Sequence, residues 1–160
     1  MLDTEGIAPL KMIKERFPDE ERLVRAKAIV ECYEEIPCNP CSTSCPTGAI
    51  TIGEDINNLP KVDFEKCSGC GLCIDSCPGL AIFVCGIAAD KARFKIPYEF
   101  LPSATAGEVW LAVDRAGTAI GPAYIEKVIT KPHQDRTVIL QVTVDRALLY
   151  RFITVRRPDE

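Results

Sequence analysis

The sequence of 160 residues lacks features that mark several classes of protein. It has no uninterrupted apolar run of about 18 residues, so no segment is predicted to span a membrane. The N-terminal residues MLDTEGIAPLKMIKERF do not show the basic and then apolar order of a secretory signal, which favours a cytoplasmic protein. The 19 basic and 23 acidic residues give a net charge of −4 without a basic run, so nucleic acid is not expected as a partner.

Motifs for catalysis and nucleotide binding are also missing. The single histidine, His133, is expected in a surface turn, and no nucleophile has an obvious base. No G-x-G-x-x-G or Walker A segment offers a cradle for phosphates, so we expect no FAD or NAD site. We therefore predict no catalytic residue, and expect the chain to serve chemistry performed elsewhere.

Cysteine is abundant by contrast, with nine residues that all lie between Cys32 and Cys85. An odd number would leave one thiol outside a closed set of disulfides. In a chain without an export signal, clustered cysteines indicate metal ligation before disulfide formation, because the cytosol keeps thiols reduced.

The cysteine region repeats itself with an offset of 32 residues. This offset places Cys38, Cys41, Cys45 and Pro46 on Cys70, Cys73, Cys77 and Pro78. In each copy the Cys-Pro pair is expected to lead through a helical turn into a strand, at residues 49–52 (AITI) and 81–84 (AIFV). Two copies of one structural unit therefore stand in tandem.

The second copy reads CSGCGLCIDSCP from Cys67. Three thiolates with two residues between neighbours can reach three corners of one cuboidal 4Fe-4S cluster, and Gly69 and Gly71 allow the tight turn. A pair of zinc sites also uses C-x2-C spacing, but it needs neither the third cysteine nor the repeated Cys-Pro ending.

With this spacing, residues 38–84 resemble a bacterial-type two-cluster ferredoxin domain. The resemblance implies an α+β, ferredoxin-like, pseudo-twofold fold of βαβ-type repeats that holds two 4Fe-4S clusters. The family's ligand rule gives cluster one the thiolates of Cys67, Cys70 and Cys73 from the second copy and Cys45 from the first.

The same rule gives cluster two Cys38, Cys41 and Cys77, but its remaining ligand position falls on Glu35. Three explanations compete: Cys32 supplies the fourth thiolate from the end of a helix, the cluster is 3Fe-4S, or the Glu35 carboxylate ligates. If it is no ligand, Cys32 is an inert buried thiol. Cys85 lies in the apolar run AIFVCGIAA and is expected to pack as a small core residue.

The rest of the chain predicts three further segments. Residues 1–33 are expected to be a helical extension with a helix over about 19–33, ahead of the ferredoxin domain at 34–90. Residues 91–107 carry Pro97 and Pro102 and suggest a linker. Residues 108–160 predict a small antiparallel β domain, with strands at 109–113, 124–129, 137–144 and 150–155 and a hairpin turn at 114–117.

A second resemblance concerns partners. The stretch ECYEEIPCNPCSTSCPTGAI, residues 31–50, is similar to the ferredoxin-like subunits of FAD-dependent amino-acid or amine dehydrogenases, including the proline and hydroxyproline type. It implies a hetero-oligomer in which this chain relays single electrons from a flavin-containing subunit to an acceptor, with the β domain and its turn as docking element. The alternatives are a free ferredoxin with an accessory domain and a structural or regulatory iron-sulfur protein.

Overall fold

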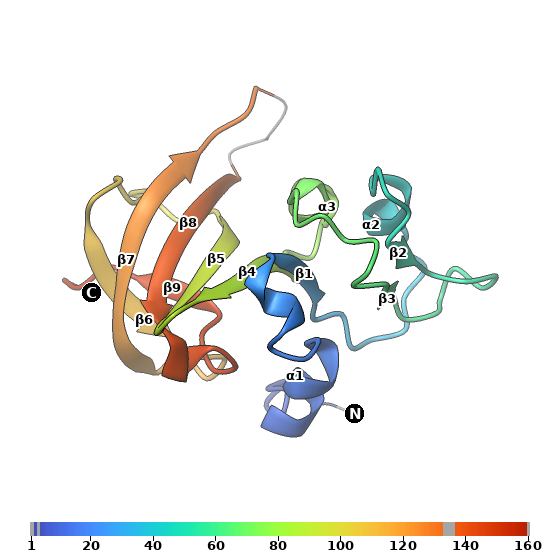
Figure 1. Ribbon diagram of the computed structural model, residues 1–160, viewed down its shortest axis with the longest axis horizontal. Coiled ribbons are helices and arrows are strands. Elements are labelled where there is room, and N and C mark those ends of the chain that lie inside the picture. Colours follow the sequence, from blue (N-terminus) through green and yellow to red (C-terminus); the bar gives the residue numbers. More distant parts are fainter. Residues whose placement is uncertain (1, 3, 133–136, 160) are drawn as a thin grey trace.

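The computed structural model describes residue 2 and residues 4–132 and 137–159, so the turn expected around His133 lies outside the described residues. A large antiparallel sheet stands beside a smaller part built from loops and short helices (Figure 1). The helical elements are α1 (Leu10–Arg16), η1 (Arg22–Val24), α2 (Pro40–Thr43), α3 (Leu72–Ser76) and η2 (Arg146–Leu148). The strands are β1 (Lys27–Val30), β2 (Ile50–Thr51), β3 (Lys61–Val62), β4 (Ile82–Ala88), β5 (Lys91–Tyr98), β6 (Val109–Val113), β7 (Ala119–Ile129), β8 (Val138–Asp145) and β9 (Thr154–Arg156).

Seven strands form the large sheet in the order β1-β4-β5-β8-β7-β6-β9, and every neighbouring pair is antiparallel. The hairpin of β2 and β3 forms a second, two-stranded sheet within the cysteine region. The mixed α+β architecture therefore agrees with the sequence, but the sheet is larger than expected, because strands of the cysteine region belong to it.

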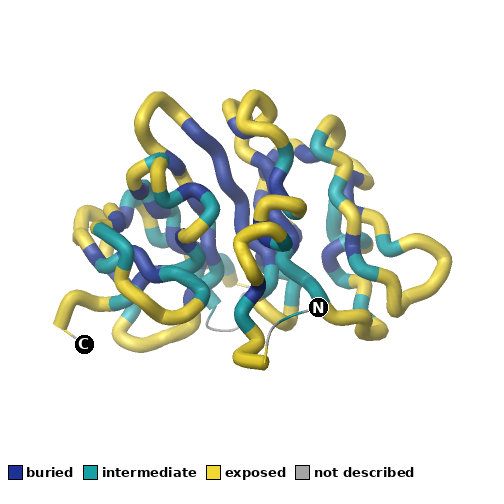
Figure 2. Tube along the Cα trace, turned by 90° about the horizontal axis from the view of Figure 1, so that it is seen from below, coloured by how far each residue is buried: buried dark blue, intermediate teal, exposed yellow. Residues whose placement is uncertain are grey.

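The strands β1 and β4 join the two parts because both of their faces are buried (Figure 2). One face contributes Ala28, Val30, Ile82 and Val84 to a core that includes several of the cysteines. The other face contributes Ile29, Phe83, Cys85 and Ile87 to the main core of the sheet. The two parts are therefore continuous through one pair of strands.

The prediction of a helix over residues 19–33 is wrong. Its segment contains the single turn η1 and the strand β1, while the only N-terminal α-helix among the described residues is α1, at Leu10–Arg16. The residues AIV that follow Lys27 in β1 are apolar without alternation, because β1 is covered on both sides. This removes the period of two that identifies a half-buried strand.

The prediction of a linker over residues 91–107 is also wrong in its first half, because Lys91–Tyr98 forms β5. A two-residue turn joins β4 to β5, with Ala88 opposite Lys91. Pro97 is tolerated because β4 ends its pairing opposite Lys95, so at Pro97 the strand has a partner only in β8.

The C-terminal strands follow the sequence more closely. The structure confirms strands at 109–113 and 124–129, although β7 already begins at Ala119. The predicted hairpin turn is present: the Asp114 carboxylate accepts hydrogen bonds from two backbone N–H groups, and Gly117 has φ +81°. In the last segment only Thr154–Arg156 is a strand, and the helical turn η2 precedes it.

Among the described residues, no helix has the length and apolarity needed to cross a membrane.

Candidate metal centre

Four of the predicted ligands surround one space, which we call cavity one. Cys45, Cys67, Cys70 and Cys73 line it. Cys67 and Cys73 are buried, whereas Cys70 is exposed. The first copy of the repeat therefore brings one cysteine to the three that the second copy supplies, as the sequence predicts.

A second space, which we call cavity two, is lined by Cys32, Cys38, Cys41 and Cys77. Glu35 does not line it, and this residue is exposed. Cys32 reaches the cavity from the segment that follows β1, not from a helix end, because β1 ends at Val30. The structure thus brings a fourth thiol to the cavity whose expected fourth position holds Glu35.

The two copies present their cysteines in the same way. Each of α2 and α3 lies between cysteines of one copy, at positions that differ by the offset of 32. These turns precede the Cys-Pro pairs and do not follow them as expected. The backbone N–H of Ala49 donates to Cys45 Sγ at 3.3 Å, and that of Ala81 donates to Cys77 Sγ at 3.4 Å. Both sulfur atoms are thus held by equivalent backbone groups.

Gly69 fixes the cysteine loop of cavity one against β1. Its φ is +73°, and a Cβ atom placed on it would lie 2.3 Å from the carbonyl oxygen of Ala26. A side chain at this position would therefore collide with backbone. Beside this contact, the N–H of Ala28 donates to Cys67 Sγ at 3.3 Å, so the loop and β1 meet at the ligand itself.

The thiols differ in acidity. Burial raises the pKa of Cys73 to about 12, and the nearby Cys67 and Cys70 add to this rise. Burial also raises the pKa of Cys32, followed by the effects of Cys77 and Cys38. These mutual effects indicate that the thiols lie close together in each cavity, where bound iron would offset the repulsion between thiolates.

The pKa of Cys45 shifts in the opposite direction. Burial opposes its ionisation, but hydrogen bonds from the Thr47 hydroxyl and from backbone N–H groups outweigh burial and lower its pKa to about 7. Cys45 is therefore prepared to act as a thiolate.

The two cavities fit a polynuclear cluster better than a single ion. Within the described part of the chain, no three His, Cys, Asp or Glu side chains gather closely enough to hold one metal ion. Four thiolates on one zinc ion, with Zn–S bonds of about 2.3 Å, would stand almost in contact. Here the four thiols instead surround a space, which the inorganic atoms of an iron-sulfur cluster would fill.

The apolar residues near the cysteines divide into three groups by burial. Four of them are buried in the cysteine core: Ile50, Ile74, Ile82 and Val84. Ile52 and Phe64 are partly buried, whereas Ile36 and Leu72 are exposed at 48% and 41%. The cysteine core is thus dry on the side of the sheet and open toward solvent near Ile36 and Leu72.

A buried ion pair connects the hairpin turn at 114–117 with cavity two. The Arg115 guanidinium binds the Glu31 carboxylate through two hydrogen bonds, and it also donates to the carbonyl groups of Tyr150 and Arg151. Both partners of the ion pair are about nine-tenths buried. The turn expected to dock a partner therefore rests on the residue before Cys32, and its role in docking stays a prediction.

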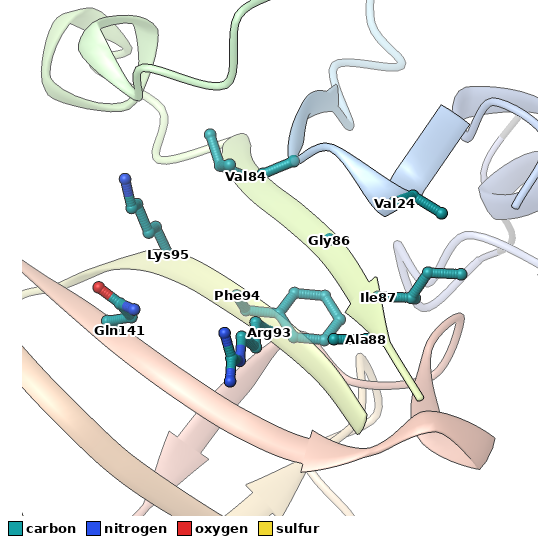
Figure 3. Close-up of a pocket in the computed structure, with 10 residues that line it drawn as sticks. Val24, Val84, Gly86, Ile87, Ala88, Arg93, Phe94, Lys95 and Gln141 are labelled. Atoms are coloured by element: carbon teal, nitrogen blue, oxygen red, sulfur yellow. The ribbon is translucent and has the colours of Figure 1, made fainter. Parts of the chain in front are cut away.

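Another cavity opens over the sheet next to the cysteine loop (Figure 3). Arg93, Lys95 and Gln141 extend from β5 and β8 on one side, and Val24 lies on the other. Lys95 also approaches the loop of cavity one, since its Cδ lies 4.0 Å from the Cβ position of a residue placed at Gly71.

Sequence reasoning missed two sets of residues near the thiols. Lys27 is buried and its Nζ donates to the Cys67 carbonyl at 2.8 Å. The other set is the ion pair of Glu31 and Arg115, which are 84 residues apart. No local pattern marks these contacts, because each depends on how β1 and the hairpin turn meet the cysteine region.

Comparison with known proteins agrees with this geometry. Residues 36–81 match the family described as 4Fe-4S dicluster domain. The chain is similar to a subunit of the Na⁺-translocating ferredoxin:NAD⁺ oxidoreductase complex of Acetobacterium woodii, with 58% identity over 24% of this chain and 11% of the relative. It is also similar to pyruvate synthase subunit PorD of Methanocaldococcus jannaschii, with 43% identity over 35% of this chain and 63% of the relative.

A third relative belongs to an ion-translocating oxidoreductase complex of Methanosarcina acetivorans, with 40% identity over 42% of this chain and 23% of the relative. The chain thus spans less than a quarter of the two longer relatives and less than two thirds of the shortest of the three. No solved structure matches the chain.

Proposed function

Because residues 36–81 form a bacterial-type two-cluster ferredoxin domain, we propose that the chain is an electron-transfer subunit of an oxidoreductase complex. The observation that carries the proposal is the presence of two cavities with four cysteine thiols each. The similarity to proteins named as subunits of oxidoreductase complexes supports the same role.

We assign the ligands by cavity. Cys45, Cys67, Cys70 and Cys73 hold cluster one. Cys38, Cys41, Cys77 and Cys32 hold cluster two, which is then a complete 4Fe-4S cluster. The exposed position of Glu35 favours the thiolate of Cys32 over a carboxylate ligand.

The residues of this chain hold the clusters and control their surroundings. Each bound cluster would supply a site that gains and loses one electron. Backbone N–H groups orient Cys45, Cys67 and Cys77 and stabilise negative charge on their sulfur atoms. Ile82 and Val84 keep water from the side of the sheet, while Cys70 at the surface leaves cavity one accessible to a redox partner.

The partner is a flavin-containing dehydrogenase subunit of the amino-acid or amine type. The similarity of residues 31–50 to the small subunits of such enzymes supports this partner. Exposed apolar side chains support a bound rather than a free protein: Phe100 and Leu101, in the loop after β5, are 73% and 85% exposed. This loop lies beside a cavity that Arg156 and Arg157 help to line.

The ligand assignment is tested with Cys32→Ala and the matched variant Cys85→Ala, after anaerobic reconstitution with iron and sulfide. Cys85 is buried in the main core and lines neither cavity, so its replacement should leave both clusters intact. Cys32→Ala should lose one iron from one cluster and show the EPR signal of a 3Fe-4S cluster. Equal iron counts and 4Fe-4S signals in both variants would refute Cys32 as a ligand.

The function is tested on the parent protein. Dithionite should reduce both clusters reversibly, with the EPR signals of two interacting reduced clusters. Clusters that assemble but cannot be reduced would identify a structural or regulatory protein. Isolation of the native complex then tests the partner: a flavin-containing subunit supports the proposal, and a chain that stays monomeric in its native source would identify a free carrier.

A further inference from the structure

The two cavities differ in the buried charge beside them. Lys27 is only 8% exposed, and its ammonium group donates to the carbonyl oxygen of the ligand Cys67 at 2.8 Å. No carboxylate of the described residues forms an ion pair with it, so its positive charge stands uncompensated beside cavity one. Asp75, in the helix α3 that carries Cys73, is paired with Lys131 at 2.5 Å.

Beside cavity two the buried charges cancel. Arg115 and Glu31 form a bidentate ion pair directly before Cys32, with both side chains about nine-tenths buried. This pair adds a dipole and no net charge. Water screens a buried charge less than an exposed one. At short range, the net charge of Lys27 therefore acts more strongly on cavity one than the neutral pair of Glu31 and Arg115 acts on cavity two.

The hydrogen bonds to cysteine sulfur atoms also differ between the two cavities. At cavity one, Cys67 Sγ accepts from the N–H of Ala28, and Cys45 Sγ accepts from the N–H of Ala49 and lies 3.5 Å from the Thr47 hydroxyl oxygen. At cavity two, Cys77 Sγ accepts from the N–H of Ala81, and the backbone of Ser42 hydrogen-bonds to Cys41. Hydrogen bonds to sulfur favour the more negative, reduced state of a cluster.

We propose that Lys27 is a positioning residue that makes cluster one easier to reduce than cluster two. The inference rests on the proposed electron-transfer function. Reduction adds one negative charge to a cluster, and a buried ammonium group next to its ligand stabilises that charge. An electron that enters at either cluster therefore settles on cluster one, beside the exposed Cys70 from which an acceptor can take it.

Lys95 provides the matched control. It approaches Gly71 in the same cysteine loop, but its side chain lines the open cavity over the sheet, where water reaches it (Figure 3). Its charge lies beside the same cluster with stronger solvent screening. Replacing Lys95 should therefore have a smaller effect than replacing Lys27 by the same residue.

The test compares Lys27→Met and Lys95→Met in the complete, reconstituted protein. Iron and acid-labile sulfide are counted first, so that every potential comes from a fully loaded sample. EPR-monitored redox titration then gives the two potentials, and Cys32→Ala marks the signal of cluster two. Lys27→Met should lower the equilibrium constant for reduction of cluster one about tenfold, which is ~59 mV for one electron. Lys95→Met should change it by less than about threefold.

Three results decide the inference. In the parent protein, cluster one should be reduced before cluster two, and the reverse order would overturn the proposal without any change at Lys27. A fully loaded Lys27→Met with unchanged potentials, or with a shift no larger than that of Lys95→Met, would overturn it as well. If Lys27→Met does not load, Lys27→Gln replaces it in the same comparison. A parent protein that assembles no reducible clusters would instead refute the proposed function.

Discussion

Replacing Arg115 with Met should loosen the hairpin turn from the cysteine region. The change leaves Glu31 buried and charged without its partner, and it also removes the hydrogen bonds to the carbonyl groups of Tyr150 and Arg151. Breaking a buried ion pair from one side costs about 3–5 kcal/mol. We therefore expect the free energy of unfolding to fall by about 4 kcal/mol.

Urea titration of the loaded protein measures this effect through the visible absorbance of the clusters. With an m value of about 2 kcal/mol/M, the loss corresponds to a shift of the urea midpoint by about 2 M. Because released clusters do not rebind, the midpoint is compared between variants at one fixed incubation time. Glu31 directly precedes Cys32, so cluster two should be lost before cluster one in Arg115→Met.

Arg151→Met is the control, because Arg151 forms a long ion pair with Asp114 at 3.7 Å and is 55% exposed. An exposed pair contributes at most about 1 kcal/mol. The double variant Glu31→Gln/Arg115→Met should be less destabilised than the sum of its single variants, by about 1–3 kcal/mol. If Arg115→Met shifts the midpoint no more than Arg151→Met, the buried pair does not hold the two parts together.

Three further predictions concern local packing. Gly69→Ala should prevent loading of cluster one, because its Cβ would meet the Ala26 carbonyl, whereas Gly71→Ala, with no atom closer than 3.7 Å, should retain both clusters; equal iron contents would contradict this. Cys85→Ser should lower stability by about 1–3 kcal/mol through an unpaired buried hydroxyl, while Cys85→Ala keeps both clusters, as urea midpoints can show. Tyr33→Phe should raise stability by about 1 kcal/mol at pH 7, because the buried Tyr33 hydroxyl has no hydrogen-bond partner among the described residues. Burial raises the pKa of Tyr33 from 10.0 to about 12, so the unfolded chain loses this proton first and the free energy of unfolding falls as the pH rises from 10 toward 12. Tyr33→Phe should reduce this alkaline loss in urea titrations at pH 9 and 11, and an equal loss in both proteins would contradict it.

The repeated cysteine spacing carried the resemblance to two-cluster ferredoxins. The ligand rule of that family assigned seven thiols to two sets, and the structure gathers the same sets around two cavities. The eighth thiol, Cys32, could be suggested from the missing ligand at Glu35, but its approach to cavity two depends on where β1 ends. Assignment of the ligands themselves remains a prediction until iron is measured.

The sheet was harder to predict because its strands are covered in different ways. The alternation in β8 was visible, since Leu140, Val142 and Val144 point into the main core. β5 alternates in the same way, but Pro97 suggested a linker. The proline fits in the strand because the pairing of β4 with β5 ends at Lys95, before Pro97. The run KAIV of β1 carries no period at all, since two cores cover its two faces.

The position of Lys27 could not be read from the sequence. A lysine at the start of an apolar run is usually solvated, and only the contact between β1 and the cysteine loop encloses it. Long-range contacts of this kind determine the surroundings of a ligand, and the sequence did not predict them. The proposed ligand set follows from the resemblance to two-cluster ferredoxins, which depends on short motifs in the sequence.

The strand pair β1 and β4 limits how modular this protein is. A ferredoxin fragment cut after residue 90 would keep β4 but lose β5, its neighbour in the sheet. The side chains of Phe83, Cys85 and Ile87, which pack in the main core, would then face water along an unpaired strand edge. Such an edge invites aggregation. The cysteine region is therefore not expected to be stable as a separate fragment, because it shares strands with the large β-sheet.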